Sequence, residues 1–325
     1  MGEGPKEILM KTQIMHGTSL TVTRIALGCM RLPPDHSDVM RAIRTALDEG
    51  INFFDHANVY QRGRAEEAFS ALWSESPGLR DKIILQSKCG IRFAGDPSDG
   101  DPKRYDFSYK HIVESVNDSL KRLKTDRLDI LLLHRPDPLV EPEEVAQAFA
   151  ELRAAGKVRF FGVSNHSGAQ IDLLKTALKE PIIANQLEIS VLHSTLINAG
   201  VLVNQDPPAY PLRAEGTLEY CRTHKITMQA WGPLAKGVAT GKPLDGADER
   251  VRKTAEVVSS IAADHGVSGE AVLIAWVLRH PAHIQAIIGT MNPERIKACC
   301  RADSLELTRE EWWRLFGAGR GGDVT

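Results

Sequence analysis

The sequence predicts a parallel (β/α)8 barrel, or TIM barrel, with a β-hairpin before it and an extra helix after it. A short apolar strand pattern followed by an amphipathic helix pattern occurs eight times along the 325 residues, with mostly short connections. Eight parallel strands are the number that closes such a sheet on itself. An open doubly wound sheet is the alternative, but no Gly-x-Gly-x-x-Gly follows the first strand pattern. No segment rich in Pro, Gly or Ser interrupts the repeats, so residues 1–325 are expected to form one domain.

The composition is that of an ordinary soluble globular protein. Hydrophobic residues make up 42% of the chain and charged residues 25%, which is sufficient for a full core. Forty basic residues stand against 42 acidic ones, so we expect no nucleic-acid partner. The five cysteines form no Cys-x-x-Cys pair and are odd in number, which argues against a disulfide framework. The first residues lack a signal-peptide core and no apolar run reaches membrane-spanning length, so we expect a cytoplasmic protein with no membrane partner.

The strand patterns follow one another in a regular order. A hairpin is expected first, from Ile8–Ile14 to Leu20–Val22, with its turn at His16-Gly17-Thr18. The eight barrel strands are short apolar runs, and we expect them at Arg24–Leu27, Ile51–Phe54, Ile83–Ser87, Leu128–Leu133, Val158–Val163, Ile182–Gln186, Ile226–Trp231 and Ile284–Ile288.

Each strand is followed by a helix pattern with apolar residues on one face. The first helix is expected to begin near Ser37, a good N-cap, and to end at Gly50. The C-terminal helix is expected to begin at Thr308, because Glu311 completes a capping box. The loops at residues 198–215 and 233–248 are long for a barrel, so we expect them to form walls or lids of a site. The remaining helices are expected at residues 65–73, 111–123, 145–156, 171–178, 217–224, 249–264 and 270–278, and from residue 293 onward.

Four residues capable of acid–base chemistry follow three successive strand patterns. Asp55 and Tyr60 follow the second strand, Lys88 the third and His134 the fourth. Because the carboxyl ends of barrel strands share one rim, we expect these side chains to converge on one pocket. The pKa of a tyrosine is normally about 10, and a neighbouring ammonium lowers it. Lys88 would supply this charge, Asp55 would hold Lys88, and His134 would orient a substrate oxygen, which suits the reduction of a carbonyl once hydride is delivered.

Other interpretations apply to these residues when they are taken singly. A tyrosine or histidine alone more often packs in a core or an interface, and a lysine at a strand end is usually solvated. Asp55, His56, His134 and His166 are also candidate metal ligands. Barrel metal hydrolases typically carry a His-x-His pair on an early strand, and this chain has none, so we expect no metal.

With these motifs in order along the whole chain, the sequence resembles the aldo-keto reductase superfamily, and its small bacterial oxidoreductases in particular. The resemblance implies NADPH-dependent reduction of an aldehyde or ketone to an alcohol, with Tyr60 as the general acid assisted by Lys88, Asp55 and His134. The segments that carry it are Asp55-x-Ala57-x-x-Tyr60, Lys88, His134-Arg135-Pro136-Asp137-Pro138, Gly156-Lys157-Val158-Arg159, Gly162-Val163-Ser164-Asn165, Ala184-Asn185-Gln186 and Ala230-Trp231-Gly232-Pro233-Leu234.

The resemblance also implies where the nicotinamide cofactor binds. Polar groups after the fifth and sixth strands would bond the carboxamide, although a helix cap or turn is the simpler role for Ser164 alone. Trp231 would stack on the nicotinamide ring, with a place in the barrel core as the alternative. The loop at 234–242 would hold the pyrophosphate through backbone amides and lysine charge. The implied cofactor residues are Gly28, Cys29, Met30, Ser164, Asn165, Gln186, Trp231, Gly232, Pro233, Leu234, Ala235, Lys236, Gly237, Gly289, Thr290 and Arg295.

The adenosine end departs from the family pattern. Strictly NADPH-dependent relatives usually carry a lysine where Gly289 lies, and Cys299 replaces the asparagine or glutamate that contacts adenine. Arg295 and Thr290 remain as candidates for the 2′-phosphate. The resemblance therefore implies NADPH with a weaker discrimination against NADH than is usual.

The substrate pocket is expected to involve Arg31, His56, Arg135, His166 and the two long loops. The two arginines would attract a carboxylate or phosphate, although solvated arginines are commoner. A cofactor-sensing binding subunit is the competing function, and the chain shows no long partner-docking segment that would support it. We expect a small-molecule carbonyl substrate and, by family analogy, a monomer.

Overall fold

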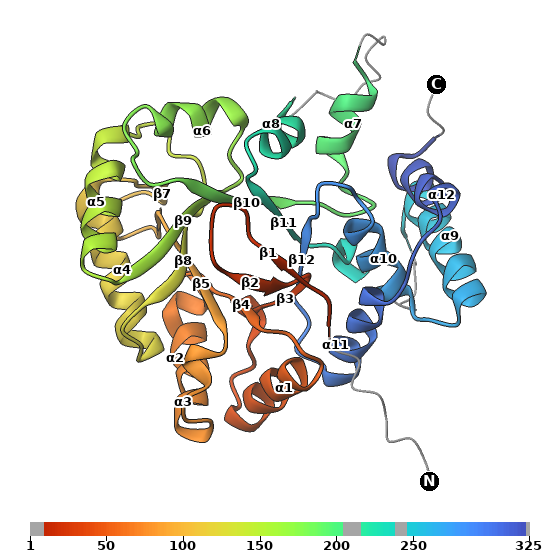
Figure 1. Cartoon of the computed structure of the whole chain (residues 1–325), viewed down its shortest axis with the longest axis horizontal. Coiled ribbons are helices and arrows are strands. Elements are labelled where there is room, and N and C mark those ends of the chain that lie inside the picture. The colour runs from red at the N-terminus through yellow and green to blue at the C-terminus, as the bar shows by residue number, and fades with distance from the viewer. Residues whose placement is uncertain (1–9, 204–215, 238–245, 323–325) are drawn as a thin grey trace.

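The barrel strands form a closed ring of eight parallel strands in the computed structural model, which describes residues 10–203, 216–237 and 246–322 (Figure 1). The last strand pairs with the first, since Ala286, Ile287 and Ile288 lie opposite Ile25, Ala26 and Leu27. The predicted TIM barrel is therefore confirmed. In order around the ring the strands are β3 (Ile25–Gly28), β4 (Phe53–Asp55), β5 (Ile84–Cys89), β8 (Leu128–Leu133), β9 (Val158–Ser164), β10 (Ile182–Glu188), β11 (Thr227–Trp231) and β12 (Gln285–Ile288).

A hairpin covers the amino-terminal end of the barrel. Strands β1 (Thr12–Ile14) and β2 (Thr21–Thr23) pair in antiparallel fashion. Apolar side chains of this hairpin pack with inward-facing residues of five barrel strands, so they fill the floor of the barrel. The largest of these residues are Met15, Leu20, Val22, Phe53, Ile130, Leu132, Ile183 and Ile287.

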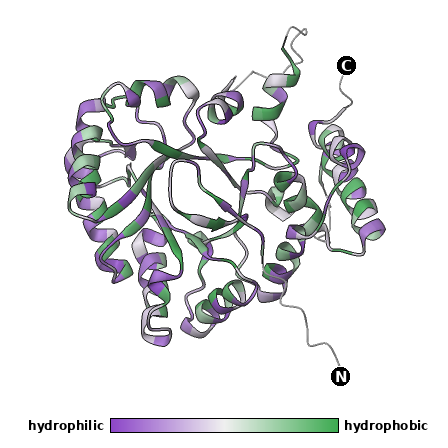
Figure 2. Ribbon diagram, viewed as in Figure 1, coloured by the Kyte–Doolittle hydropathy of each residue, from purple (hydrophilic) through white to green (hydrophobic). Residues whose placement is uncertain are grey.

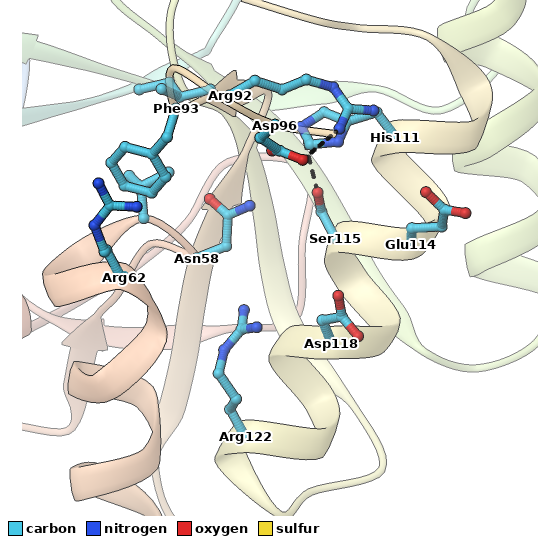
Figure 3. A pocket seen from close by; sticks show the side chains of 12 residues that line it. Asn58, Arg62, Arg92, Phe93, Asp96, His111, Glu114, Ser115, Asp118 and Arg122 are labelled. Carbon is cyan, nitrogen blue, oxygen red and sulfur yellow. Dashed lines mark hydrogen bonds and ion pairs between the residues drawn. The ribbon is translucent and has the colours of Figure 1, made fainter. Parts of the chain in front are cut away.

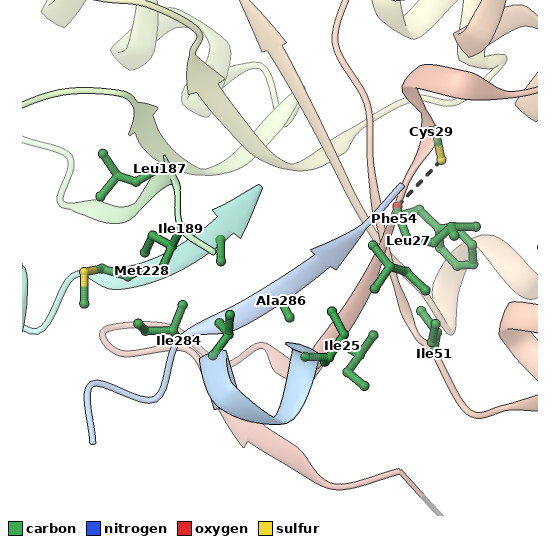
Figure 4. Close-up of a cluster of buried hydrophobic side chains, with 14 of the residues drawn as sticks. Ile25, Leu27, Cys29, Ile51, Phe54, Leu187, Ile189, Met228, Ile284 and Ala286 are labelled. Carbon is green, nitrogen blue, oxygen red and sulfur yellow. Dashed lines mark hydrogen bonds between the residues drawn. The ribbon is translucent and has the colours of Figure 1, made fainter. Parts of the chain in front are cut away.

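Helices surround the ring of strands, as Figure 1 shows, and their polar faces point outward (Figure 2). Apolar side chains fill the layer between strands and helices, and Figure 4 shows the part of it around β3 and β12. The α-helices are α1 (His36–Asp48), α2 (Arg64–Ser70), α3 (Leu72–Glu75), α4 (Tyr109–Leu123), α5 (Pro142–Ala154), α6 (Gly168–Lys175), α7 (Thr195–Val201), α8 (Thr217–Thr223), α9 (Glu249–His265), α10 (Gly269–Leu278), α11 (Pro293–Cys300) and α12 (Arg309–Arg320). Short 3-10 turns are η1 (Cys29–Arg31), η2 (Tyr60–Gly63), η3 (Leu79–Asp81), η4 (Ala235–Gly237) and η5 (Arg301–Asp303).

The extra C-terminal helix is present and begins as predicted. Thr308 accepts a hydrogen bond from the backbone of Glu311, and the Glu311 carboxylate bonds the backbone of Thr308. Helix α12 packs on the helix layer, because Trp312 stacks on Trp276 of α10 with ring centroids 5.2 Å apart. The capping-box prediction is therefore confirmed.

Several local predictions were wrong or incomplete. Helix α1 begins at His36 with Asp35 as its N-cap, because the Asp35 carboxylate accepts from the backbone N–H of Asp38. The strands β6 (Ile91–Arg92) and β7 (Arg104–Tyr105) form a hairpin that was not predicted, since two residues a strand carry too little periodicity. Helix α7 occupies the start of the first long loop. Residues 204–215 and 238–245, which make up most of the two predicted loops, lie outside the described residues.

Within the described ranges, no single helix is long and apolar enough to cross a membrane. Helices α9 and α10 reach the required length only as a pair, and they are bent by 95° relative to each other.

Candidate active site

A buried ion pair lies at the carboxyl end of the barrel. Asp55 is the last residue of β4 and Lys88 lies on the neighbouring strand β5. The Lys88 ammonium is 2.8 Å and 2.7 Å from the two Asp55 oxygens, and the side chains are only 0% and 3% exposed. The ammonium also donates to the carbonyl of His56 at 2.8 Å. A lysine buried this deeply needs such acceptors, because an unpaired charge in a core is very costly.

Tyr60 contacts the same ammonium from the loop after β4. Its Oη lies 3.0 Å from Lys88 Nζ. The loop is held in place by backbone hydrogen bonds from His56 to the Gln86 carbonyl and from Asn58 to the Lys88 carbonyl. An ammonium can only donate, so the Tyr60 oxygen accepts this bond. The bond to Lys88 therefore does not use the hydroxyl proton of Tyr60.

The turn that carries Tyr60 has an unusual backbone. Gln61 and Arg62 have φ values of 51° and 58°, which are rare for residues other than glycine. The Gln61 amide donates to the carbonyls of Met30 and Leu32, and so ties η2 to η1. Strained backbone of this kind persists where the surroundings determine it, and it is common at functional sites.

His134 follows β8 and faces Tyr60. Its backbone N–H donates to the Cys89 carbonyl at 2.9 Å, and its ring centroid is 6.0 Å from that of Tyr60 at an angle of 80°. Burial, together with the charges of Lys88 and Arg135, holds the pKa of His134 well below its ordinary value. The imidazole is therefore neutral at pH 7. Its Nδ1 is buried and bonds no residue of the described chain.

The pKa of Tyr60 differs from the sequence-based expectation. Burial raises the pKa of Tyr60, and the opposing effect of the Lys88 charge is too small to reverse the shift. The pKa of Lys88 is also raised: although burial lowers it, the attraction of Asp55 and the bonds to Asp55 and Tyr60 outweigh that effect. Lys88 lowers the pKa of Tyr60 as expected, but desolvation, which the sequence-based expectation did not include, is the larger effect.

Three polar residues on the neighbouring side of the rim are connected to one another. Asn165, with φ of 61°, donates from its amide to Ser164 Oγ at 2.8 Å and to the His134 carbonyl at 3.3 Å. Ser164 Oγ donates to the Gln186 carbonyl at 2.9 Å. The Trp231 indole N–H donates to Asn165 Oδ1 at 3.2 Å. This network joins the ends of β9, β10 and β11 to the histidine.

Two glutamine amides contact Asp55 directly. Gln186 Nε2 lies 3.1 Å from Asp55 Oδ1, so this predicted cofactor residue is placed beside the ion pair. Gln86 Nε2 lies 2.6 Å from the same oxygen, and sequence reasoning missed it. Its signal was a polar residue in the middle of the apolar strand β5, which alone does not reveal which group it contacts.

The other predicted cofactor residues follow β3, β11 and β12. A side chain at Gly28 would collide with Ile287, since its Cβ would lie 2.9 Å from Cγ2, whereas open space surrounds Gly289. Cys29 is buried, and Met30 is half exposed. Arg295 on α11 donates from Nε to Glu270 at 3.1 Å. Residues 232–237 form the turn after β11 that includes η4, but the side chain of residue 236 lies outside the described part of the chain. Thr290 follows β12 and is partly exposed.

The predicted pocket residues divide into two groups. Arg31 is exposed on η1, and Arg135 lies with its guanidinium 5.7 Å from the Trp231 ring. His56 is buried against Phe69, with both ring nitrogens unpartnered among the described residues, and burial lowers its pKa to about 3. His166 is buried too, so both imidazoles lie beneath the rim surface.

A cavity of about 280 Å³ lies on the α4 side of the Tyr60 loop (Figure 3). It lies between η2, the β6–β7 hairpin and α4, and Asn58 and Val59 form part of its wall. Neither Tyr60 nor its three partners line it. Its charged lining residues are Arg62, Arg92, Asp96, Glu114, Asp118 and Arg122.

A family model described as the Aldo/keto reductase family matches residues 24–318. The chain belongs to the aldo/keto reductase family. As a member of that family it is an NAD(P)H-dependent oxidoreductase that acts on carbonyl compounds.

Bacterial proteins resemble this aldo/keto reductase along most of its length. The uncharacterized oxidoreductase YcsN of Bacillus subtilis is 37% identical over 319 residues, which is 96% of this chain and 99% of that protein. A 6-dehydroglucose reductase of Agrobacterium fabrum is 34% identical, with 94% and 97% covered. The oxidoreductase YdhF of Escherichia coli is 35% identical over 283 residues, with 87% of each covered.

Solved structures share the fold. The glycerol dehydrogenase of Gluconobacter oxydans has a TM-score of 0.77 at 26% identity and covers 94% of both chains. An aldo-keto reductase from Bacillus halodurans, in its holo form, has a TM-score of 0.78 at 23% identity, with 95% of this chain and 96% of that one covered. The family model and the bacterial relatives confirm the predicted family, and the solved structures agree in fold.

Proposed function

We propose that this protein reduces an aldehyde or ketone to an alcohol with NADPH, and that Tyr60 is its proton donor. The observation that carries the proposal is the bonding of Lys88. One buried ammonium donates to Asp55, to the His56 carbonyl and to the Tyr60 oxygen. The Tyr60 hydroxyl proton is left available beside a positive charge, which is the arrangement needed to protonate an oxygen that gains negative charge.

Each residue of the site has a separate role in the proposed reduction. A bound reduced nicotinamide would supply the hydride that adds to the carbonyl carbon. Tyr60 breaks its O–H bond and gives the proton to the carbonyl oxygen, which becomes the hydroxyl of the product. The resulting phenolate is stabilised by Lys88 until it takes a proton from solvent. Neutral His134 hydrogen-bonds the carbonyl oxygen without adding a charge, and so orients it towards Tyr60.

The described residues fit a nicotinamide nucleotide. Asn165 and Trp231 lie partly exposed at the ends of β9 and β11 and are bonded to each other, so an amide and an aromatic plane occupy adjacent positions. We propose that Ser164, Asn165, Gln186 and Trp231 hold the nicotinamide and that residues 232–237 hold the pyrophosphate.

The choice between NADPH and NADH would depend on Arg295 and Thr290. The bond from Arg295 Nε to Glu270 orients the guanidinium, and its terminal nitrogens bond no residue of the described chain. A guanidinium held in this way can form a fork with a phosphate. Gly289 contributes no charge, so we propose that NADPH is preferred by a smaller factor than in relatives that carry a lysine.

The substrate proposed is a small polar carbonyl compound. Two relatives are named 6-dehydroglucose reductase, one from Agrobacterium fabrum and one from Novosphingobium aromaticivorans. Sugar aldehydes therefore belong beside simple aldehydes in the first substrate panel. We propose a monomer acting in the cytoplasm, which sedimentation of the purified protein and cell fractionation would test.

The experiment is a fluorescence titration with NADPH and NADH, followed by turnover with the aldehyde panel. Quenching by NADPH together with turnover would support the reductase. Tight NADPH binding without turnover of any aldehyde would support a cofactor-sensing subunit instead. Failure to bind either nucleotide would overturn the proposal.

A further inference from the structure

Four buried glutamines connect the ion pair to the floor of the barrel. Gln86, Gln186, Gln229 and Gln285 lie on β5, β10, β11 and β12, and none is more than 2% exposed. They form a continuous hydrogen-bonded series, which we call the glutamine ladder. The ladder begins at Asp55 and ends at the Thr23 carbonyl on the hairpin that covers the floor.

Every contact in the ladder is within hydrogen-bond distance. Gln86 Nε2 and Gln186 Nε2 lie 2.6 Å and 3.1 Å from Asp55 Oδ1. The same two nitrogens lie 3.0 Å and 3.2 Å from Gln229 Oε1. Gln229 Nε2 donates to Gln285 Oε1 at 2.8 Å, and Gln285 Nε2 donates to the Thr23 carbonyl at 2.7 Å.

The two ends of the ladder determine the direction of every amide. The Thr23 carbonyl can only accept, so Gln285 must turn its NH2 group towards the floor. The oxygen of Gln285 then faces Gln229, which must donate to it. The oxygen of Gln229 must therefore face Gln86 and Gln186. Gln86 and Gln186 are therefore forced to present NH2 groups, and they present them to Asp55 as well. The floor of the barrel thus specifies that Asp55 is surrounded by donors.

The ladder has a cost in stability. Burying an amide is unfavourable unless all of its groups are bonded, and Gln86 Oε1 is buried with no partner among the described residues. The rest of the same interior is filled by apolar residues such as Phe53, Leu132 and Ile287. Apolar side chains at the glutamine positions would fill the same space without this cost. Buried polar groups that lower stability are commonly found at functional sites.

We propose that the glutamine ladder is a positioning device for catalysis, in which Gln229 and Gln285 hold Gln86 and Gln186 in the orientation that fixes Asp55 against Lys88. Neither Gln229 nor Gln285 reaches the substrate; both act through the residues above them. The inference rests on the proposed function, because Asp55 matters only if Lys88 and Tyr60 do the chemistry. It predicts that the rate depends on residues at the far end of the barrel.

The test uses variants of the full-length enzyme with saturating NADPH and one aldehyde that the wild type reduces. Gln229→Leu breaks the ladder in the middle, and we expect kcat to fall about tenfold while KM and NADPH affinity change less than about twofold. Gln285→Leu breaks it one bond further away, and the expected fall is about threefold. Ile287→Val is the control, since Ile287 lies on the same strand as Gln285 and packs in the same interior, and its apolar side chain forms no hydrogen bond of the ladder.

Gln229→Glu provides a second test, through the pH dependence of activity. A protonated carboxyl at position 229 can accept from Gln86 and Gln186 and donate to Gln285, whereas an ionised carboxylate cannot donate. Burial raises the pKa of a carboxyl, so this variant should be active at mildly acidic pH and lose activity as the pH rises. The wild type and Gln229→Leu should lack this loss.

The outcomes separate the two proposals. If Gln229→Leu keeps the kcat of Ile287→Val, or Gln229→Glu has the wild-type pH profile, the ladder inference is overturned. The same holds if NADPH affinity or KM changes while kcat does not. If Gln229→Leu does not fold, Gln285→Leu and Gln229→Glu decide the question. Tyr60→Phe is measured in parallel: an active Tyr60→Phe overturns the proposed function, whereas an inactive one with normal ladder variants overturns only the ladder.

Discussion

Lys88 Nζ lies 3.0 Å from Tyr60 Oη and donates a hydrogen bond to it. Tyr60 lies on the loop after β4 and Lys88 on strand β5. Both carboxylate oxygens of Asp55 accept from the same ammonium and so fix its position beside the phenol. Tyr60 therefore has a partly buried hydroxyl whose proton is not used in the bond to the lysine. Acid strength here is a balance of burial, which raises the pKa of Tyr60, and the lysine charge, which lowers it.

Tyr60→Phe should abolish most of the reductase activity. General acid catalysis contributes roughly a hundred- to ten-thousandfold, so we expect a fall of kcat in that range. NADPH affinity, measured by fluorescence quenching, should stay within about twofold, because the ring is retained. Tyr220→Phe removes a hydroxyl that contacts Asp172 on the outer surface and is the matched control. Equal losses of turnover and of NADPH affinity would contradict the assignment.

Lys88→Met should unfold more easily than the wild type, because it leaves the Asp55 carboxylate buried without its partner. Breaking one side of a buried ion pair costs about 3–5 kcal/mol in the free energy of unfolding. The double variant Lys88→Met with Asp55→Leu removes both charges and should recover most of this stability. Activity should not return. Denaturant unfolding of both variants measures the difference, and a double variant no more stable than the single one would refute the explanation.

The rate of reduction should be insensitive to pH around neutrality. His134 has a pKa well below its ordinary value, so it stays neutral where a free imidazole titrates. Reduction needs protonated Tyr60, whose pKa is raised above 10, so kcat/KM should fall only in strongly alkaline solution. A pH profile of the wild type tests both statements. A loss of activity that follows a group titrating at about pH 6.5 would show that His134 is not held neutral.

His166 should make the fold sensitive to acid. Its ring stacks on Phe107, its Nδ1 donates to the Ser164 carbonyl, and burial lowers its pKa to about 4 from 6.5. The unfolded chain binds this proton more readily, so stability is complete above about pH 6.5 and is lost as the pH falls through that value toward 4. At pH 4 the loss is about 3 kcal/mol.

His166→Phe removes the titrating group and should show a correspondingly flatter decline. Unfolding in denaturant at pH 7 and pH 4 compares the two proteins. Identical declines in wild type and variant would mean that His166 is not the group that takes up the proton.

Arg295→Ala should weaken NADPH binding more than NADH binding, because only NADPH carries the 2′-phosphate. We expect about a tenfold loss for NADPH, consistent with one charge-assisted contact. Lys297→Ala, on the same helix and paired with Glu294, is the control for a general loss of positive charge. Equal losses for both nucleotides in Arg295→Ala would remove this residue from the phosphate site.

Much of the fold follows from local patterns. The strand Leu128–Leu133 has the predicted bounds, and the Thr308–Glu311 capping box starts its helix as expected, because both signals lie within a few consecutive residues. The β6–β7 hairpin and helix α7 were missed for the opposite reason: each is too short for its periodicity to stand out.

The sequence by itself determined the barrel, the family and the grouping of Asp55, Tyr60, Lys88 and His134 on one rim, because alternation along a chain and strand-end positions are local properties. Only the tertiary structure decided the net direction of the Tyr60 pKa, the burial of His166 and the contact of Gln86 with Asp55. Desolvation and hydrogen bonds between residues far apart in the chain depend on which side chains the closed barrel brings together, and no pattern within one strand contains that information.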